Sequence, residues 1–317
     1  MKHALVLLLA FASILGHAQG WPNSPVRAVV PVGAGSSTDI IHRLVLEQLA
    51  AQIGQAVVVE NRLGAGGTIG SAVVAKAAPD GYTLLAHGSA HSIAPAIYKS
   101  LPYHPLRDFV GVASVGVSPS VLVVPPTSGV KSIADLLAAA KARAMPLTFS
   151  SVGIGTATHL GAERFLASVG VPGTHIPYKG GAEAMTEVMA GRVGFFFGPT
   201  ALVLPNIRSG RLVALAVNSH ARSAALPEVP TLREVGVRDA EYPIWFGLFA
   251  PARTPRDIVD KLNREVQKAL QAPPLRDKLL ALGVEALPMS PDELATYLER
   301  EFELNAALAQ QAGLKAE

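Results

Sequence analysis

Residues 61–70 read Asn-Arg-Leu-Gly-Ala-Gly-Gly-Thr-Ile-Gly. This glycine-rich stretch follows the apolar run 56–59 and precedes an alanine-rich segment that ends at Pro79. It therefore joins a predicted strand to a predicted helix. Glycine lets the backbone approach a ligand closely and turn N–H groups toward it, and the following helix adds the positive end of its dipole. The pattern predicts an anion site that needs no charged side chain.

The same order of strand, loop and helix recurs along most of the chain. Strands are expected at 26–32, 56–60, 82–86, 121–124, 147–150, 173–176, 193–197 and 212–217, and helices between several of them at 40–53, 68–77, 132–143, 156–169, 182–190 and 200–209. This alternation predicts an α/β fold built on parallel-type sheets with helices on both faces. The last part is helical, with helices expected at 255–271, 274–282 and 291–312.

Two extended proline-rich pieces, 119–126 and 243–251, bracket the middle block of strands and helices. We interpret them as two crossings between lobes. The expected division is lobe 1 at 19–122 and 248–317, and lobe 2 at 123–247. A cleft between two such lobes would bring several strand-end loops face to face, which suits a small ligand.

The N-terminus has the pattern of an export signal. Lys2 precedes the apolar core 5–15, and small residues at 16–18 offer a cleavage site after Ala18. The core is short for a membrane span, so cleavage is favoured over an uncleaved anchor. We expect residues 1–18 to be a signal peptide and the mature protein to be periplasmic.

Composition excludes several classes of protein. The chain has no cysteine, which removes a disulfide scaffold, a thiolate metal site and a cysteine nucleophile. The formal charge of +3 includes Lys2, and both signs are spread along the chain without a basic block. Nucleic-acid binding is therefore not expected.

Two further loops share the design of a strand, a small polar loop and a helix. They are residues 31–39, Pro-Val-Gly-Ala-Gly-Ser-Ser-Thr-Asp, and residues 150–159, Ser-Ser-Val-Gly-Ile-Gly-Thr-Ala-Thr-His. Their hydroxyls and N–H groups can bind a ligand. Thr38 or Asp39 could instead only cap the first helix, and His159 would pack or bond locally rather than catalyse. Two loops of one design suggest two lobes that face one ligand.

Rival site chemistries fit poorly. The glycine spacing at 64–69 is not that of a dinucleotide or Walker loop, because Ile69 stands at the third glycine position and no Lys-Ser or Lys-Thr follows. His87 and His91 are four residues apart, a spacing that could hold a metal on a helix. They follow a predicted strand, however, and Gly88 lies between them, so we expect a loop here. No third metal ligand is evident, and a metal site is not favoured. No Gly-x-Ser-x-Gly elbow occurs. Many binding loops and few reactive groups favour a receptor over an enzyme.

Taken together, these motifs resemble the Bug-type extracytoplasmic solute receptors, the substrate-binding components of tripartite tricarboxylate transporters. The pieces that carry the resemblance are 31–39, 54–67, 78–84, 151–160, 176–180, 215–217 and 245–247. They span nearly the whole mature chain. The resemblance implies a two-lobed, type II periplasmic-binding-protein (Venus-flytrap) fold and a small carboxylate ligand held mainly by backbone N–H groups, hydroxyls and water.

The resemblance also implies where the ligand binds. The expected ligand-binding residues are Gly35, Ser36, Ser37, Thr38, Gly66, Gly67, Ser89, His91, Ser151, Gly155, Thr156, Tyr178, Gly198 and Thr200. Within that set, Tyr178 could wall the cleft with its ring. No metal and no cofactor are expected.

Five positions depart from the family pattern, and one of them, Leu63, replaces a common proline. Val32-Gly33 replaces a usual Phe-Pro, Ala94 stands where Asn is common, and Gly198 stands where an acid is often found. An acid there could hold a ligand's ammonium group, so Gly198 argues against an amino-acid ligand.

The expected function is a monomeric receptor that captures a di- or tricarboxylate or an aromatic acid and delivers it to integral-membrane transporter subunits. Two alternatives remain open. The same receptor fold could serve a signalling system as a ligand sensor, or the chain could be an exported enzyme, for which no nucleophile with its base is evident.

Overall fold

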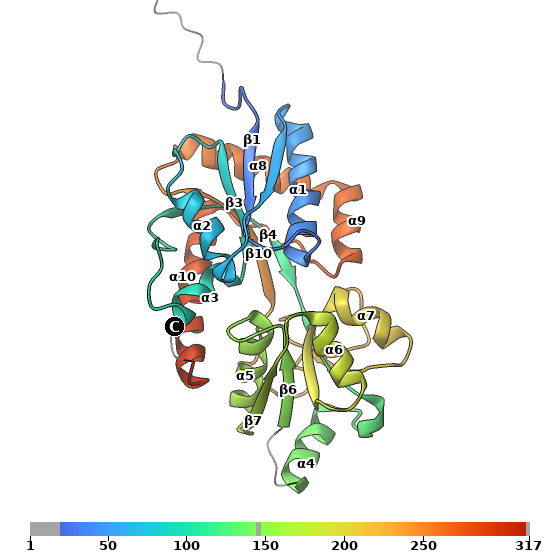
Figure 1. The fold of residues 1–317 in the computed structure, drawn as a ribbon. Coiled ribbons are helices and arrows are strands. Elements are labelled where there is room, and N and C mark those ends of the chain that lie inside the picture. Colours follow the sequence, from blue (N-terminus) through green and yellow to red (C-terminus); the bar gives the residue numbers. More distant parts are fainter. Residues whose placement is uncertain (1–19, 144–146, 315–317) are drawn as a thin grey trace, which may run out of the picture.

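The computed structural model describes residues 20–143 and 147–314. The signal peptide expected at residues 1–18 lies outside these ranges. Within them, no helix combines the length and apolar character that crossing a bilayer requires. The chain folds into two α/β lobes, each built on a five-stranded sheet (Figure 1).

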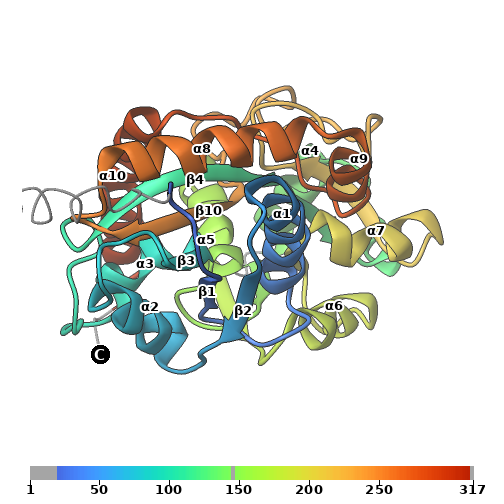
Figure 2. The ribbon, with the colours of Figure 1, turned by 90° about the horizontal axis from the view of Figure 1, so that it is seen from above.

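The sheet of lobe 1 has the strand order β2-β1-β3-β10-β4. Its strands are β1 (Val26–Val30), β2 (Val57–Asn61), β3 (Thr83–Gly88), β4 (Phe109–Ser118) and β10 (Ile244–Pro251). Its helices are α1 (Ser37–Ile53), α2 (Thr68–Ala75), α3 (Ala90–Ile97), α8 (Arg256–Gln271), α9 (Pro273–Ala281) and α10 (Pro291–Gln311), with a short 3₁₀ turn, η1, at Ala65–Gly67. Seen from above, α1 and α9 lie to one side of the strands and α2 and α3 to the other (Figure 2).

Strand periodicity explains these layers. Side chains alternate between the two faces of a strand. Ala28 and Val30 of β1 therefore enter one apolar cluster, with α1, α8 and α9, while Val29 enters the opposite cluster, with α2 and α10. Because both faces are covered, the strands are apolar almost throughout.

Lobe 2 repeats this plan with the strand order β7-β6-β8-β5-β9. Its strands are β5 (Ser120–Val124), β6 (Leu147–Ser151), β7 (Gly173–Pro177), β8 (Phe195–Pro199) and β9 (Val213–Val217). Its helices are α4 (Ile133–Arg143), α5 (Ala157–Val169), α6 (Gly181–Met189) and α7 (Thr200–Arg208), with a 3₁₀ turn, η2, at Pro126–Ser128. Phe195 and Phe197 of β8 pack toward α5, and Phe196 packs with α6 and α7 on the other face.

The sheets are mixed rather than purely parallel. Strand β10 runs antiparallel to β3 and β4, and β5 runs antiparallel to β8 and β9. The chain leaves lobe 1 between β4 and β5, at Pro119, and returns between β9 and β10. The antiparallel strands β5 and β10 are the ones that follow the two crossings, and the proline-rich sequence did not reveal their direction. The expected lobe boundaries, 122/123 and 247/248, fall inside β5 and β10.

Two elements were not expected from sequence. Strand β4 contains Gly111 and Gly116, which weaken a strand pattern, but it pairs with β10 along its length. Helix α3 begins two residues after Gly88 and contains Pro95, so the stretch beyond Ser89 looked like a loop. Packing stabilises it, because Ile93 of α3 contacts an apolar cluster that includes Leu308 of α10 and Leu160 of α5. That cluster also joins the two lobes on one side.

Candidate functional site

The site lies between the lobes, where the parallel strands end. Helices α1 and α3 follow β1 and β3, and α5, α6 and α7 follow β6, β7 and β8. Each helix starts at the carboxyl end of its strand, so the helix N-termini of both lobes meet at one cleft. This convergence concentrates N–H groups and positive dipole ends at the cleft.

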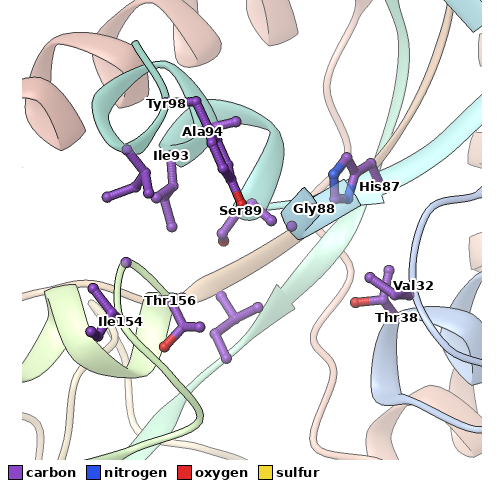
Figure 3. A pocket seen from close by; sticks show the side chains of 16 residues that line it. Val32, Thr38, His87, Gly88, Ser89, Ile93, Ala94, Tyr98, Ile154 and Thr156 are labelled. Atoms are coloured by element: carbon purple, nitrogen blue, oxygen red, sulfur yellow. The ribbon is translucent and has the colours of Figure 1, made fainter. Parts of the chain in front are cut away.

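Two adjoining cavities fill the cleft. The first, about 210 Å³, we call the α3 chamber; it lies between α3 and the loop before α5 (Figure 3). The second, about 460 Å³, we call the α7 chamber; the N-terminal residues of α1, α5, α6 and α7 line it. Thr38, Ala157 and Ile244 line both chambers, so the two are continuous. No Lys, Arg, Asp or Glu of the described ranges lines either one.

A larger hollow of about 610 Å³ lies elsewhere, on the surface of lobe 1. It is formed mainly by residues 98–108 and Phe302. Only Tyr98 links it to the α3 chamber. Volume alone would favour this hollow, but the convergence of helix N-termini occurs in the cleft.

The loop before α1 is fixed by its own side chains. Ser36 is the N-cap of α1, and its hydroxyl accepts the N–H of Asp39 at 3.3 Å. The buried Asp39 carboxylate accepts the N–H of Gly35 at 2.9 Å and hydrogen bonds from Arg43 and Asn61. Burial alone would raise the pKa of Asp39, but these hydrogen bonds together lower it below its usual value. The Gly35 N–H is thus committed inside the loop.

The loop before α5 is fixed in the same way. Gly155 donates its N–H to Nδ1 of His159 at 3.0 Å, and the Thr156 hydroxyl donates to the Gly153 carbonyl at 2.7 Å. Ser151 is buried, and its Oγ lies 2.6 Å from Nε2 of His175. Gly155 and Thr156 line the α3 chamber, whereas Ser151 lines neither cavity.

The donors left for a ligand are the first N–H groups of α1 and α5. Those of Ser37, Thr38, Ala157 and Thr158 have no hydrogen-bond partner in the part of the chain that the structure describes. All four residues line the α7 chamber. The sequence analysis named Ser37 and Thr38 but not Ala157 and Thr158, because a backbone N–H group offers no side-chain signal in the sequence.

The glycine-rich loop that opened the sequence lies beside the α3 chamber. Gly64, Gly66 and Gly67 all have positive φ, which favours glycine. Gly66 lines the chamber, and a methyl group on it would approach the Tyr98 hydroxyl to 2.6 Å. Gly67 donates its N–H to the Gly64 carbonyl, so its amide is used within the turn.

The side chains at the end of β3 and the start of α3 that line the α3 chamber differ from those expected. Ser89 lines the α3 chamber and accepts the N–H of Trp245 at 3.0 Å. His91 points into lobe 1, where its Nε2 lies 3.2 Å from the Pro105 carbonyl and its ring packs against Phe249. The histidine that lines the chamber is His87, which sequence reasoning treated only as a weak metal ligand. Among the described residues, no cluster of three or more His, Asp or Glu side chains could hold a metal.

Thr200, Gly198 and Tyr178, like Gly67, His91 and Ser151, line neither chamber. The Thr200 hydroxyl donates to the Pro119 carbonyl at 2.7 Å. A methyl group on Gly198 would collide with Cγ1 of Val203, in the core of lobe 2, so an acid there would not face the cleft without rearrangement. Tyr178 packs at the edge of an apolar cluster of lobe 2. The argument from Gly198 against an ammonium-bearing ligand therefore loses its basis.

Sequence reasoning also missed the apolar wall of the α3 chamber. Ile93 and Ala94 of α3 and Ile154 of the loop before α5 form this wall (Figure 3). Ile97 of α3 also lines it. The signal that could have found them is their position within a few residues of a strand end.

Comparison with known proteins agrees with this geometry. A family model described as "Tripartite tricarboxylate transporter family receptor" matches residues 41–314. A Pseudomonas sp. (strain P51) protein, "UPF0065 protein in tcbD-tcbE intergenic region", is 39% identical over 284 residues, covering 89% of this chain and 84% of that protein. BugT of Bordetella pertussis is 36% identical over 300 residues, covering 94% of this chain and 92% of BugT.

Solved structures with this fold include proteins with carboxylates bound. Rpa4515 of R. palustris, solved with adipate, has a TM-score of 0.82 at 32% identity and covers 94% of this chain and 100% of its own. MatC of Rhodopseudomonas palustris, solved with bound malate, has a TM-score of 0.77 at 30% identity, with 91% and 100% coverage. The periplasmic binding protein BugD has a TM-score of 0.78 at 35% identity, with 94% and 100% coverage.

Proposed function

The chain belongs to the tripartite tricarboxylate transporter receptor family, and on that premise we propose that it captures a small organic carboxylate in the periplasm. It would then deliver the ligand to the membrane subunits of a tripartite transporter, after export and cleavage near Ala18. The family and its structural neighbours are solute-binding receptors, not enzymes.

One observation carries the proposal: uncommitted N–H groups of α1 and α5 face one cavity from opposite lobes. Helix N-termini stabilise anions through these N–H groups and the helix dipole. A carboxylate held by Ser37 and Thr38 on one side and Ala157 and Thr158 on the other would tie the lobes together. Two structural neighbours were solved with the carboxylates adipate and malate, which supports this ligand class.

Thermal melting of the mature protein tests the ligand class. Adipate, malate, citrate and benzoate are added singly, with 1,6-hexanediol as a probe that lacks a carboxylate. A ligand at about 100 times its dissociation constant adds about 2.7 kcal/mol of stability, which raises the melting temperature by several degrees. The proposal fails if no carboxylate raises the melting temperature at millimolar concentration.

Ala157→Pro tests the clamp itself. Ala157 is the first residue of α5, where proline fits the helix, and Thr156 before it is already extended, with φ −83° and ψ 163°. The substitution therefore removes little more than one N–H group. We expect the affinity for a carboxylate to fall at least tenfold, since a hydrogen bond to a charged group contributes about 1.5–3 kcal/mol.

Ala157→Gly is the matched control, because it keeps the N–H group. Its affinity should stay within about threefold of the parent, as the change costs mainly helix propensity, about 1 kcal/mol. Equal losses in the two variants, measured by calorimetric titration, would show that this N–H group does not bind the ligand.

A further inference from the structure

His87 is a buried polar side chain without a hydrogen-bond partner. It lies near the end of β3, is 2% exposed and lines the α3 chamber (Figure 3). Across residues 20–143 and 147–314, no group hydrogen-bonds to either ring nitrogen. The ring nitrogens keep accessible surface, and His87 lines the chamber. Because buried side-chain nitrogens are nearly always paired, a ligand in the chamber can supply the partner that the fold does not.

The two histidines around it each have a carbonyl partner within lobe 1, although Nδ1 of His91 is buried without one among the described residues. His42 of α1 has Nδ1 2.7 Å from the Thr38 carbonyl and Nε2 3.1 Å from the Gly247 carbonyl. His91 of α3 has Nε2 near the Pro105 carbonyl, and its ring lies 6.0 Å from that of His87. These contacts hold His42 and His91 within lobe 1. The chamber is the remaining place where His87 can find a partner.

The surroundings of His87 also fix its charge. Burial, and then His91 and His42, lower the pKa of His87 well below its usual value. His87 is therefore neutral at neutral pH, and a neutral imidazole offers one donor and one acceptor. It can hydrogen-bond an uncharged oxygen but provides no positive charge for a second carboxylate.

The rest of the chamber is suited to hydrocarbon. Ile93, Ala94 and Ile97 form one wall, and Ile154 faces them from lobe 2 while 63% exposed. An apolar ligand group would cover Ile154 and gain about 25 cal/mol per Å² of apolar surface. An unpaired carboxylate buried there would instead be strongly disfavoured. A cavity of about 150 Å³ can hold benzene, so about 210 Å³ is enough for one ring.

We propose that the α3 chamber takes the uncharged body of a monocarboxylate, a ring or a branched chain, and that His87 hydrogen-bonds a hydroxyl or carbonyl oxygen on that body. This inference rests on the proposed function, because the single carboxylate binds the N-termini of α1 and α5. The ligand class is thus a hydroxylated or oxo-substituted apolar monocarboxylate rather than a dicarboxylate.

Calorimetric titration of the mature protein tests the proposal with ring probes that differ by one group. The probes are benzoate, its three monohydroxy isomers and phthalate, with malate and adipate as open-chain dicarboxylates. We expect at least one hydroxybenzoate to bind about tenfold more tightly than benzoate, and every dicarboxylate to bind more weakly than that isomer.

His87→Leu removes the hydrogen bond and keeps an apolar side chain. The preferred hydroxybenzoate should then bind about as weakly as benzoate, while the affinity for benzoate changes less than threefold. His220→Leu is the matched control, because His220 is exposed and far along the chain; it should leave every affinity unchanged. If the His87 variant does not fold, the order of affinities of the unaltered protein for the probes remains as a second test.

Two results would overturn the inference and leave the receptor function intact. One is tighter binding of phthalate, malate or adipate than of every monocarboxylate. The other is an equal loss of affinity for benzoate and hydroxybenzoate in His87→Leu. If no carboxylate binds at all, the proposed function fails as well.

Discussion

Gly35 in lobe 1 and Gly155 in lobe 2 occupy the same place in their loops, one residue before the N-caps of α1 and α5. Each donates its N–H to the side chain four residues later, which is a carboxylate in Asp39 and an imidazole nitrogen in His159. Four residues further on, Arg43 of lobe 1 forms an ion pair with Asp39, whereas Glu163 of lobe 2 lies 3.6 Å from His159.

This comparison separates the role of the loop glycines from that of the ligand donors. In both lobes the glycine N–H is used to fix the loop, by whichever acceptor the helix provides. The first two N–H groups of α1 and of α5 have no partner among the described residues. The two loops therefore share a backbone geometry but not a side-chain chemistry. The following substitutions test how far the loops of the two lobes differ in stability and in ligand binding.

Asp39→Ala should have the largest effect. It leaves the Gly35 N–H, the Asn61 amide and the Arg43 guanidinium without their shared acceptor. We expect the free energy of unfolding to fall by about 2–3 kcal/mol, the range for orphaned buried groups. Urea unfolding measures it. Asp39→Asn keeps an acceptor oxygen, so its free energy of unfolding should fall by about half as much as that of Asp39→Ala. An equal fall in the two variants would show that the charge of Asp39, and not its acceptor oxygen, fixes the loop.

Gly155→Ala should come next. Gly155 has φ +70°, and an added methyl group would lie 2.7 Å from Cδ1 of Ile97 across the cleft. Gly35 has φ +80°, yet a methyl group there meets nothing within 4 Å. Both changes carry the left-handed backbone cost of about 1 kcal/mol, but only the first obstructs lobe contact. Carboxylate affinity should fall at least tenfold for Gly155→Ala and less than threefold for Gly35→Ala.

His159→Leu should have a smaller effect, about 1 kcal/mol on the free energy of unfolding. It deprives the Gly155 N–H of its acceptor while retaining an apolar packing group. Glu163→Gln is the control on the same helix. Because Glu163 lies 3.6 Å from His159 in a contact that is ionic only when the histidine is protonated, it should change stability by less than about 0.5 kcal/mol. A larger effect of Glu163→Gln would show that the contact with His159 contributes to stability as an ion pair.

The smallest expected effect is on pH dependence. Burial, and then His159, lower the pKa of His175 to about 4 from a usual value of 6.5. Between these pH values the unfolded chain binds a proton that the folded protein does not. The contribution of His175 is therefore complete above pH 6.5 and is lost as the pH falls toward 4.

His175→Gln should make the melting temperature fall less steeply between pH 6.5 and 4. The buried histidines of lobe 1 also have lowered pKa values, so part of the slope should remain. Although burial acts to raise it, the pKa of Asp39 is lowered by its hydrogen bonds, so Asp39 keeps its contribution throughout this window and loses it only at lower pH. If the slope of melting temperature against pH is unchanged in His175→Gln, His175 does not contribute to the pH dependence of stability.

Much of the fold could be predicted from sequence, because strand and helix periodicities are local. Helices α2, α6 and α7 begin within about one residue of their predicted starts. Helix α3 and strand β4 could not be predicted, since packing against α10 and pairing with β10 stabilise them. The same limit applies to the site. The loops were found by composition, but the direction of each side chain depends on neighbours far along the chain.

The sequence by itself determined the α/β class, the receptor family and the three small-residue loops. The reason is that glycine, hydroxyl and strand-to-helix patterns depend only on residues close together in the chain. Tertiary structure alone decided which groups face the ligand. The loop 61–70 contributes Gly66 to a chamber wall. The donors of the cleft are N–H groups of α1 and α5, and His87 rather than His91 faces the chamber. The physical reason is that a donor is available only if no neighbour within the fold has already taken it.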